Sequence, residues 1–207
     1  AAKVLLLLVV AVLCGLLLEQ LRREHTETER ERALALRLRA LYSLFESLST
    51  TLDLHLSLPT VAEAPKALLG AEWTSVALLD EAGEYLSIVA GAGIEVASLA
   101  DQRWPADDSI IATILSSDQP RQVNDLHKRL PGLPAALQNQ QISPAAASTI
   151  NIPLSLDGEP LGLLDVAYSK RQTVASEDLA FLQALGHEAA LAIRNARLYE
   201  RERQQVA

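Results

Sequence analysis

The chain has 207 residues, of which 49% are hydrophobic and 21% charged, so it is neither a disordered nor a purely membranous protein. A net charge of −8 and an aromatic content of 4% argue against a nucleic-acid groove, which needs a basic face and stacking side chains. A single cysteine excludes an intrachain disulfide framework.

The N-terminal segment is an uncharged apolar run from Val4 to Leu18. At about 1.5 Å per residue it covers roughly 22 Å, less than the ~30 Å hydrocarbon core, but the long side chain of Lys3 reaches toward the interface. The run predicts a transmembrane helix over residues 1–18. A secretory signal core and a lipid anchor on Cys14 stay open, although no small-residue cleavage site precedes the charges and Leu13 is bulky for a lipidation site.

Four basic residues follow this run closely, namely Arg22, Arg23, Arg30 and Arg32. Only one basic residue, Lys3, precedes it. The positive-inside rule therefore places everything after Glu19 in the cytoplasm. Residues 19–40 read as a charged linker helix with pairs such as Glu19 and Arg23.

From Leu34 onward, apolar residues recur at alternating spacings of 4 and 3, the a/d pattern of a coiled coil. The seam consists of Leu34, Leu38, Leu41, Phe45, Leu48 and Leu52. We expect it to pack against a second copy of the chain or against the chain's own sheet.

In the following region the apolar period becomes two, which is typical of strands. Strands are expected over Trp73–Asp80, Glu84–Ala90, Thr149–Leu156 and Pro160–Tyr168. In the third, Ile150, Ile152, Leu154 and Leu156 share one face, and Asp157-Gly158 predicts a tight hairpin. Pro153 predicts a bulge or an unpaired donor, and one short helix is expected near Ser109–Ser116.

A closing helix is expected from Glu177 to Val206, with an apolar stripe of Leu182, Leu185, Ala189, Ala192, Ala196 and Tyr199. The small residues Ala189, Ala192 and Ala196 allow close helix approach, and we assign them to a dimer contact. Because the charged tail ends without a cap, we expect an output domain beyond Ala207.

Residues 41–202 resemble a GAF domain. The matching stretches are "LFESLSTTLDL" (a lead-in helix, Leu44–Leu54), "LLGAEWTSVALLDEAGEYL", "QPRQVND", "STINIPLSLDGEPLGLLDVAY" and "EDLAFLQALGHEAALAIRNARLYERE". The resemblance implies an α+β fold with an antiparallel sheet of about six strands. It further implies that the first and last helices cover one face and that a small molecule binds on the other. A GAF module after a membrane helix is similar to the input half of sensor histidine kinases and cyclases.

Catalytic signatures of such families are missing here. Bilin-attaching and methionine-sulfoxide-reducing members need a cysteine in the domain, and the only one is Cys14, so covalent bilin is not expected and the cofactor stays unknown. The cyclic-nucleotide pattern is not recognisable. His187 in "GHEAA" reads as ordinary helix rather than a phosphoacceptor, and His127 reads as a solvated loop residue rather than an anion contact. We expect no catalytic or metal-binding residues.

A ligand pocket, if present, is expected among apolar residues with one or two polar groups in the middle loops. The candidates are Trp104, Ile110, Ile114, Val123, Asn124, Leu126, Ile142 and Ile150. The alternative is that the same residues fill the core.

The sequence thus predicts a membrane-anchored, cytoplasmic sensory module that is non-catalytic and homodimeric through its terminal helices. The alternative is an accessory subunit that docks on a larger membrane complex. Continuation of the gene into a kinase-like or cyclase-like region would favour signalling. A hydrolase or transferase is the weakest option, because no nucleophile–base pair or phosphate loop is visible.

Overall fold

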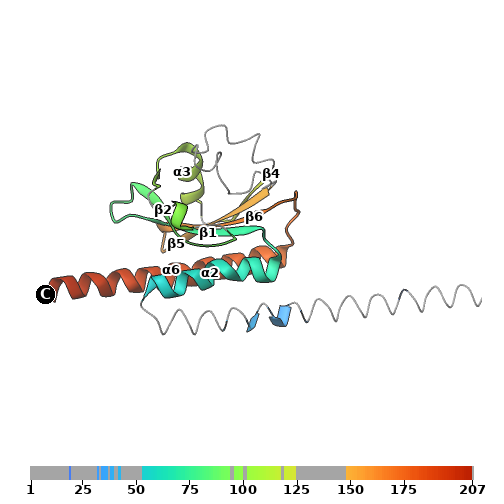
Figure 1. Cartoon of the computed structure of the whole chain (residues 1–207), viewed down its shortest axis with the longest axis horizontal. Coiled ribbons are helices and arrows are strands. Elements are labelled where there is room, and N and C mark those ends of the chain that lie inside the picture. The colour runs from blue at the N-terminus through green and yellow to red at the C-terminus, as the bar shows by residue number, and fades with distance from the viewer. Residues whose placement is uncertain are drawn as a thin grey trace, which may run out of the picture. The chain divides into compact units, whose positions relative to one another are not determined.

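A computed structural model of the chain describes residues 53–93, 96–99, 102–117, 119–124 and 148–206, together with residues 19, 32, 34–36, 38, 39 and 42 (Figure 1). The chain divides into two units, Ala1–Ala40 and Leu41–Ala207. In the first unit the described residues are helical, and Leu34 and Leu38 are 52% and 47% exposed. The seam positions Leu41, Phe45, Leu48 and Leu52 lie outside the described residues.

Within the described part of the chain, no helix is both long and apolar enough to cross a membrane. The apolar run Val4–Leu18 lies outside that part, so the transmembrane helix stays a prediction.

The second unit contains one six-stranded sheet in the order β3-β2-β1-β6-β5-β4, with every neighbouring pair antiparallel. The strands are β1 (Trp73–Leu79), β2 (Tyr85–Ala92), β3 (Trp104–Pro105), β4 (Arg121–Asn124), β5 (Ser148–Leu156) and β6 (Glu159–Tyr168). The α+β fold with about six antiparallel strands is therefore confirmed, and the two longest neighbours, β5 and β6, lie near its centre.

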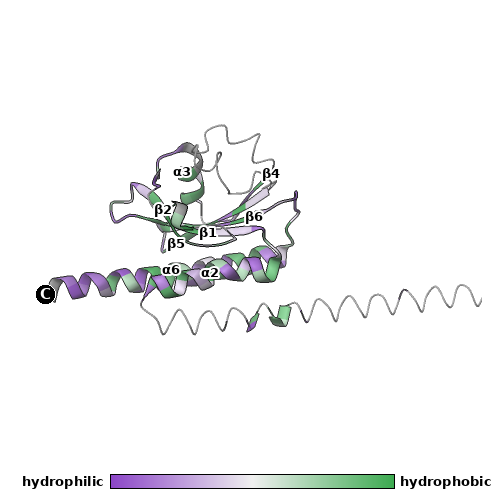
Figure 2. Ribbon diagram, viewed as in Figure 1, coloured by the Kyte–Doolittle hydropathy of each residue, from purple (hydrophilic) through white to green (hydrophobic). Residues whose placement is uncertain are grey.

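Helices cover both faces of this sheet. The long helices α2 (Leu54–Leu69) and α6 (Ser176–Val206) lie side by side on one face, as the resemblance implies (Figure 1). On the other face lie the short helices η1 (Val96–Leu99) and α3 (Ser109–Leu115). The main core fills the space between the sheet and the long helices, and the last turns of α6 are mostly hydrophilic (Figure 2).

The expected lead-in helix over Leu44–Leu54 lies almost entirely outside the described residues, and the described helix α2 begins at Leu54. Asp53 caps it by accepting a hydrogen bond from the backbone N–H of His55 at 2.9 Å, and Gly70 ends it in the left-handed conformation. Pro59 and Pro65 lie inside the helix and remove two backbone donors. Local propensity therefore argued against this helix, and burial of its apolar face against β1 and β2 stabilises it.

The hairpin between β5 and β6 forms at Asp157-Gly158 as predicted. Both residues have positive φ, 53° and 81°, as a type I′ turn requires. The bulge expected at Pro153 lies one residue further on, between Leu154 and Ser155, and Pro153 itself stays in register with Leu163.

Helix α6 approaches β5 closely at Gly186. A Cβ atom there would lie 2.8 Å from Ile152 Cγ2 and 3.5 Å from Leu154 Cδ2, and both of these side chains are buried. The absence of a side chain at Gly186 therefore sets the distance between α6 and the sheet.

We expect Gly186→Ala to lower the free energy of unfolding by roughly 1–3 kcal/mol, because the new methyl overpacks against Ile152. The matched control is Ala184→Gly at an exposed position of the same helix, which should cost only about 1 kcal/mol through helix propensity. Denaturant unfolding of both variants checks this. If Gly186→Ala is more stable than the parent, the gain in helix propensity exceeds the cost of overpacking, and the contact between α6 and Ile152 adjusts easily to a methyl group.

Candidate functional site

The sheet face opposite α2 and α6 has an apolar half and a polar half. The apolar half is a second buried cluster under η1 and α3, made of Ala77, Leu79, Leu86, Ile88, Leu99, Trp104, Ile114 and Leu163. The polar half lies beside it on β1, β6 and β5. Their register, rather than any continuous sequence motif, brings its residues together.

One row of the polar half contains Ser75, Asp165 and Asn151, which are direct cross-strand neighbours. Asn151 Nδ2 donates to Asp165 Oδ1 at 2.6 Å, and Ser75 Oγ donates to Asp165 Oδ2 at 3.3 Å. Asp165 thus has a hydrogen-bond donor on each carboxyl oxygen. The described residues give it no ion pair.

The next row contains Trp73, Ala167 and Thr149. Trp73 is 7% exposed and Thr149 is 4% exposed, yet Trp73 Nε1 and Thr149 Oγ1 have no hydrogen-bond partner among the residues that the structure describes. A buried polar group without a partner costs roughly 1–3 kcal/mol, so most such groups in native proteins are paired. Two of them in one row, on either side of a single alanine, mark this half of the face as a candidate binding site.

Burial raises the pKa of Asp165 above its ordinary value of 3.8, while the hydrogen bonds from Asn151 and Ser75 oppose the rise. Arg121 of β4 ends the same row beyond Asn151 and is exposed. The central carboxyl therefore gains a proton more readily than an ordinary aspartate.

The structure separates the predicted ligand residues. Trp104 and Ile114 lie in the apolar half, and Val123 pairs with Thr149 in the row of the polar half. Ile150 is fully buried in the main core on the opposite face, so it does not line the same site. Asn124 pairs with Ser148, and its side chain accepts a 3.4 Å hydrogen bond from Gln122. Ile110 belongs to α3, whereas Leu126 and Ile142 lie outside the described residues.

The alanines assigned to a dimer contact also need correction. Ala189, Ala192 and Ala196 are 0%, 9% and 1% exposed. The first two belong to the main core. Their small size allows α6 to pack within its own chain, so they are not available to a partner helix.

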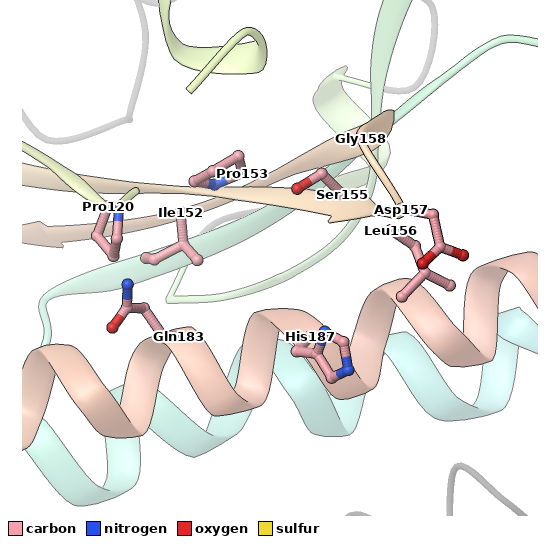
Figure 3. Close-up of a pocket in the computed structure, with 9 residues that line it drawn as sticks. All are labelled: Pro120, Ile152, Pro153, Ser155, Leu156, Asp157, Gly158, Gln183 and His187. Atoms are coloured by element: carbon pink, nitrogen blue, oxygen red, sulfur yellow. The ribbon is translucent and has the colours of Figure 1, made fainter. Parts of the chain in front are cut away.

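A separate open pocket of about 420 Å³ lies between α6 and the second half of β5 (Figure 3). Gln183 and His187 project from α6 beside it, and the hairpin residue Asp157 lies at its other end. Gln183 donates to Gln119 at 3.0 Å, and Asp157 forms a 2.6 Å ion pair with Arg194. His187 is exposed, so it reads as a surface residue of α6.

Metal chemistry finds no support in the described part of the chain, where no group of three or more His, Cys, Asp or Glu residues is placed to hold an ion.

The sequence belongs to the GAF domain family, since the family model matches residues 53–193. It therefore contains a sensory or regulatory module of the kind found in signalling proteins. A search of the curated proteins finds no match.

Solved structures share this fold at low identity. The GAF domain of a phosphoenolpyruvate-protein phosphotransferase from Coxiella burnetii aligns with a TM-score of 0.69 at 20% identity, covering 81% of this chain and 98% of that one. The free methionine-R-sulfoxide reductase of Neisseria meningitidis, in complex with its substrate, aligns at 0.64 and 21%, covering 80% and 93%. Residues 122 to 287 of a methyl-accepting chemotaxis protein align at 0.59 and 22%, covering 75% and 98%.

Sequence reasoning missed every residue of the polar half. The available signal was Asp165, a charged residue inside the apolar stretch "LGLLDVAY", together with Thr149 and Asn151 on the strand face that the isoleucines leave open. Trp73 and Ser75 carried no such local signal, because only the pairing of β1 with β6 places them beside Asp165.

We expect Thr149→Val to raise the free energy of unfolding by about 1 kcal/mol, because it removes a buried hydroxyl to which the described residues offer no partner. Thr74→Val is the matched control in the neighbouring row. Thr74 is equally buried, but its hydroxyl donates to the carbonyl of Ala62 in α2, so this variant should lose about 1 kcal/mol. Thermal or urea unfolding compares the two. Equal losses in both variants would mean that Thr149 Oγ1 has a partner after all.

We expect Asp165→Asn to change the pH dependence of stability. With a raised pKa, the folded chain keeps a proton on Asp165 at pH values where the unfolded chain has lost it, so stability falls as pH rises from 3.8 through the raised value. Asparagine does not titrate, so the advantage of the variant over the parent should grow through this window and then level off. Urea unfolding from pH 3 to 8 measures it, and a constant difference would contradict the raised pKa.

Proposed function

We propose that this chain is the membrane-anchored, cytoplasmic sensory module of a signal-transduction protein, and that it responds to a small molecule bound on the polar half of the sheet. The observation that carries the proposal is a pair of buried groups, Trp73 Nε1 and Thr149 Oγ1, which have no partner in the described part of the chain and lie beside the half-buried Asp165. A bound molecule would satisfy polar groups that the described residues leave unsatisfied. No catalytic role is assigned to any residue of the chain.

Anchoring rests on the apolar run Val4–Leu18 and on the arginines that follow it. These features favour a single N-terminal membrane helix with the GAF domain in the cytoplasm.

Helix α6 is the element best placed to respond to a ligand. It packs on β5 and β6, the strands that carry Thr149, Asn151 and Asp165 on their other face. Arg194 and Arg197 also attach α6 to the sheet, through the ion pair with Asp157 and a hydrogen bond to the carbonyl of Leu79. A shift of these strands would therefore move α6, and packed interfaces of this kind change between discrete arrangements.

Transmission to a second copy is proposed through the seam in the N-terminal helix. Its described members Leu34 and Leu38 are about half exposed within this chain, as expected for residues that a partner would cover. The proposed partners are thus a second copy of the chain, the membrane and a small molecule, with no nucleic acid.

Native mass spectrometry of the whole chain, released gently from detergent micelles, tests the proposal. We expect a dimer that carries a discrete additional mass. Leu38→Asp should yield monomers because it buries a charge in the seam. The matched control Leu36→Asp places the same charge at an exposed position outside the seam and should keep the dimer. A bare monomer in the parent would count against both the relay and the ligand, and would favour an accessory subunit.

A further inference from the structure

We propose that the polar half of the sheet face binds a small neutral molecule through an amide group, whose carbonyl oxygen accepts from Trp73 and Thr149 and whose N–H donates to Asp165. This inference rests on the proposed sensory function and names the class of ligand for that site.

Strand register fixes the geometry of the site. Trp73 and Thr149 flank Ala167 on the two neighbouring strands, so their Cα atoms lie about 10 Å apart at the usual strand spacing. Ala167 is fully buried, and its side chain is only a methyl group. Asp165 is two residues along β6 on the same face, about 7 Å away. A group of a few atoms is enough to reach all three side chains.

Hydrogen-bond chemistry sets what the ligand must offer. The indole Nε1 of Trp73 only donates, and the Thr149 hydroxyl donates or accepts, so the atom above Ala167 must be an acceptor. Each carboxyl oxygen of Asp165 already accepts one bond, from Asn151 or Ser75, and has capacity for another. The ligand atom facing Asp165 is therefore a donor. An amide carries an acceptor and a donor on adjacent atoms.

Charge favours a neutral ligand. Apart from Asp165, the side chains of the two rows on β1, β6 and β5 are uncharged, so a carboxylate ligand would be buried there beside another acid without a cation. Arg121 is the nearest cation in register, two strands from Asp165, and it is exposed at the edge strand β4.

The test compares two ring compounds of similar shape, 2-pyrrolidinone, which has a carbonyl and an N–H, and N-methyl-2-pyrrolidinone, which lacks the N–H. The whole chain in detergent micelles is labelled with ¹⁵N at the tryptophan indoles, which gives two signals because the chain has two tryptophans. Trp104→Phe assigns them. We expect 2-pyrrolidinone to shift the Trp73 indole signal in a saturable way and to leave the Trp104 signal in place. The N-methyl compound should bind at least tenfold more weakly, a difference of about 1.4 kcal/mol.

Two variants separate a binding role from a structural one. Thr149→Val should weaken 2-pyrrolidinone about tenfold although it stabilises the fold, whereas Thr74→Val should destabilise the fold and leave binding unchanged. Equal binding of both compounds, an unmoved Trp73 signal, or unchanged binding to Thr149→Val would overturn the amide assignment. If that happens while native mass spectrometry still finds a ligand on the parent chain, the sensory function stands and only the ligand class is wrong. If neither experiment detects binding, both proposals fail.

Discussion

The alternation of side chains along β5 and β6 is the constraint on which the rest of the structure depends. Ile150, Ile152 and Leu154 point to the helix layer and are buried in the main core, whereas Thr149 and Asn151 lie on the other face. The same pair of strands therefore supplies most of the core that holds α6 and most of the polar half. A shift of one residue in their register would place the isoleucines in the site and the polar side chains under α6.

Close contact between α6 and β5 makes this constraint consequential for signalling. Gly186 has no side chain, so at this point α6 packs directly against the methyl groups of Ile152 and Leu154 on β5. Protein interiors packed in this way transmit displacements instead of absorbing them. In the following turns of α6, Arg194 forms an ion pair with Asp157 of the hairpin, and Arg197 donates a hydrogen bond to the carbonyl of Leu79 at the end of β1. The helix therefore contacts the sheet at several points along its length.

Local patterns in the sequence predicted the strands and the hairpin turn, which depend on interactions between residues close in the sequence. The period-two stretches gave the four long strands, and Asp157-Gly158 gave the hairpin, because turn chemistry and alternation act over a few residues. Helix α2 was missed because its two prolines argue against a helix that tertiary packing nevertheless stabilises. The site was missed for a different reason. Its residues come from three strands and meet only through their register, and Ile150 was assigned to it even though its own alternation with Ile152 and Leu154 already placed it in the core.

The polar half lowers the stability of the fold relative to an apolar surface of the same shape. Trp73 and Thr149 would each pack without penalty as apolar residues of similar shape, and Asp165 would do so as a neutral side chain, yet the chain keeps three polar groups that its described residues only partly satisfy. Local departures from the rules that favour stability are expected at functional sites, where a ligand restores the missing interactions. A ligand that restores them would stabilise β1, β6 and β5 relative to one another. Since α6 packs on the reverse side of β5 and β6, the free energy of binding would then act directly on the position of that helix.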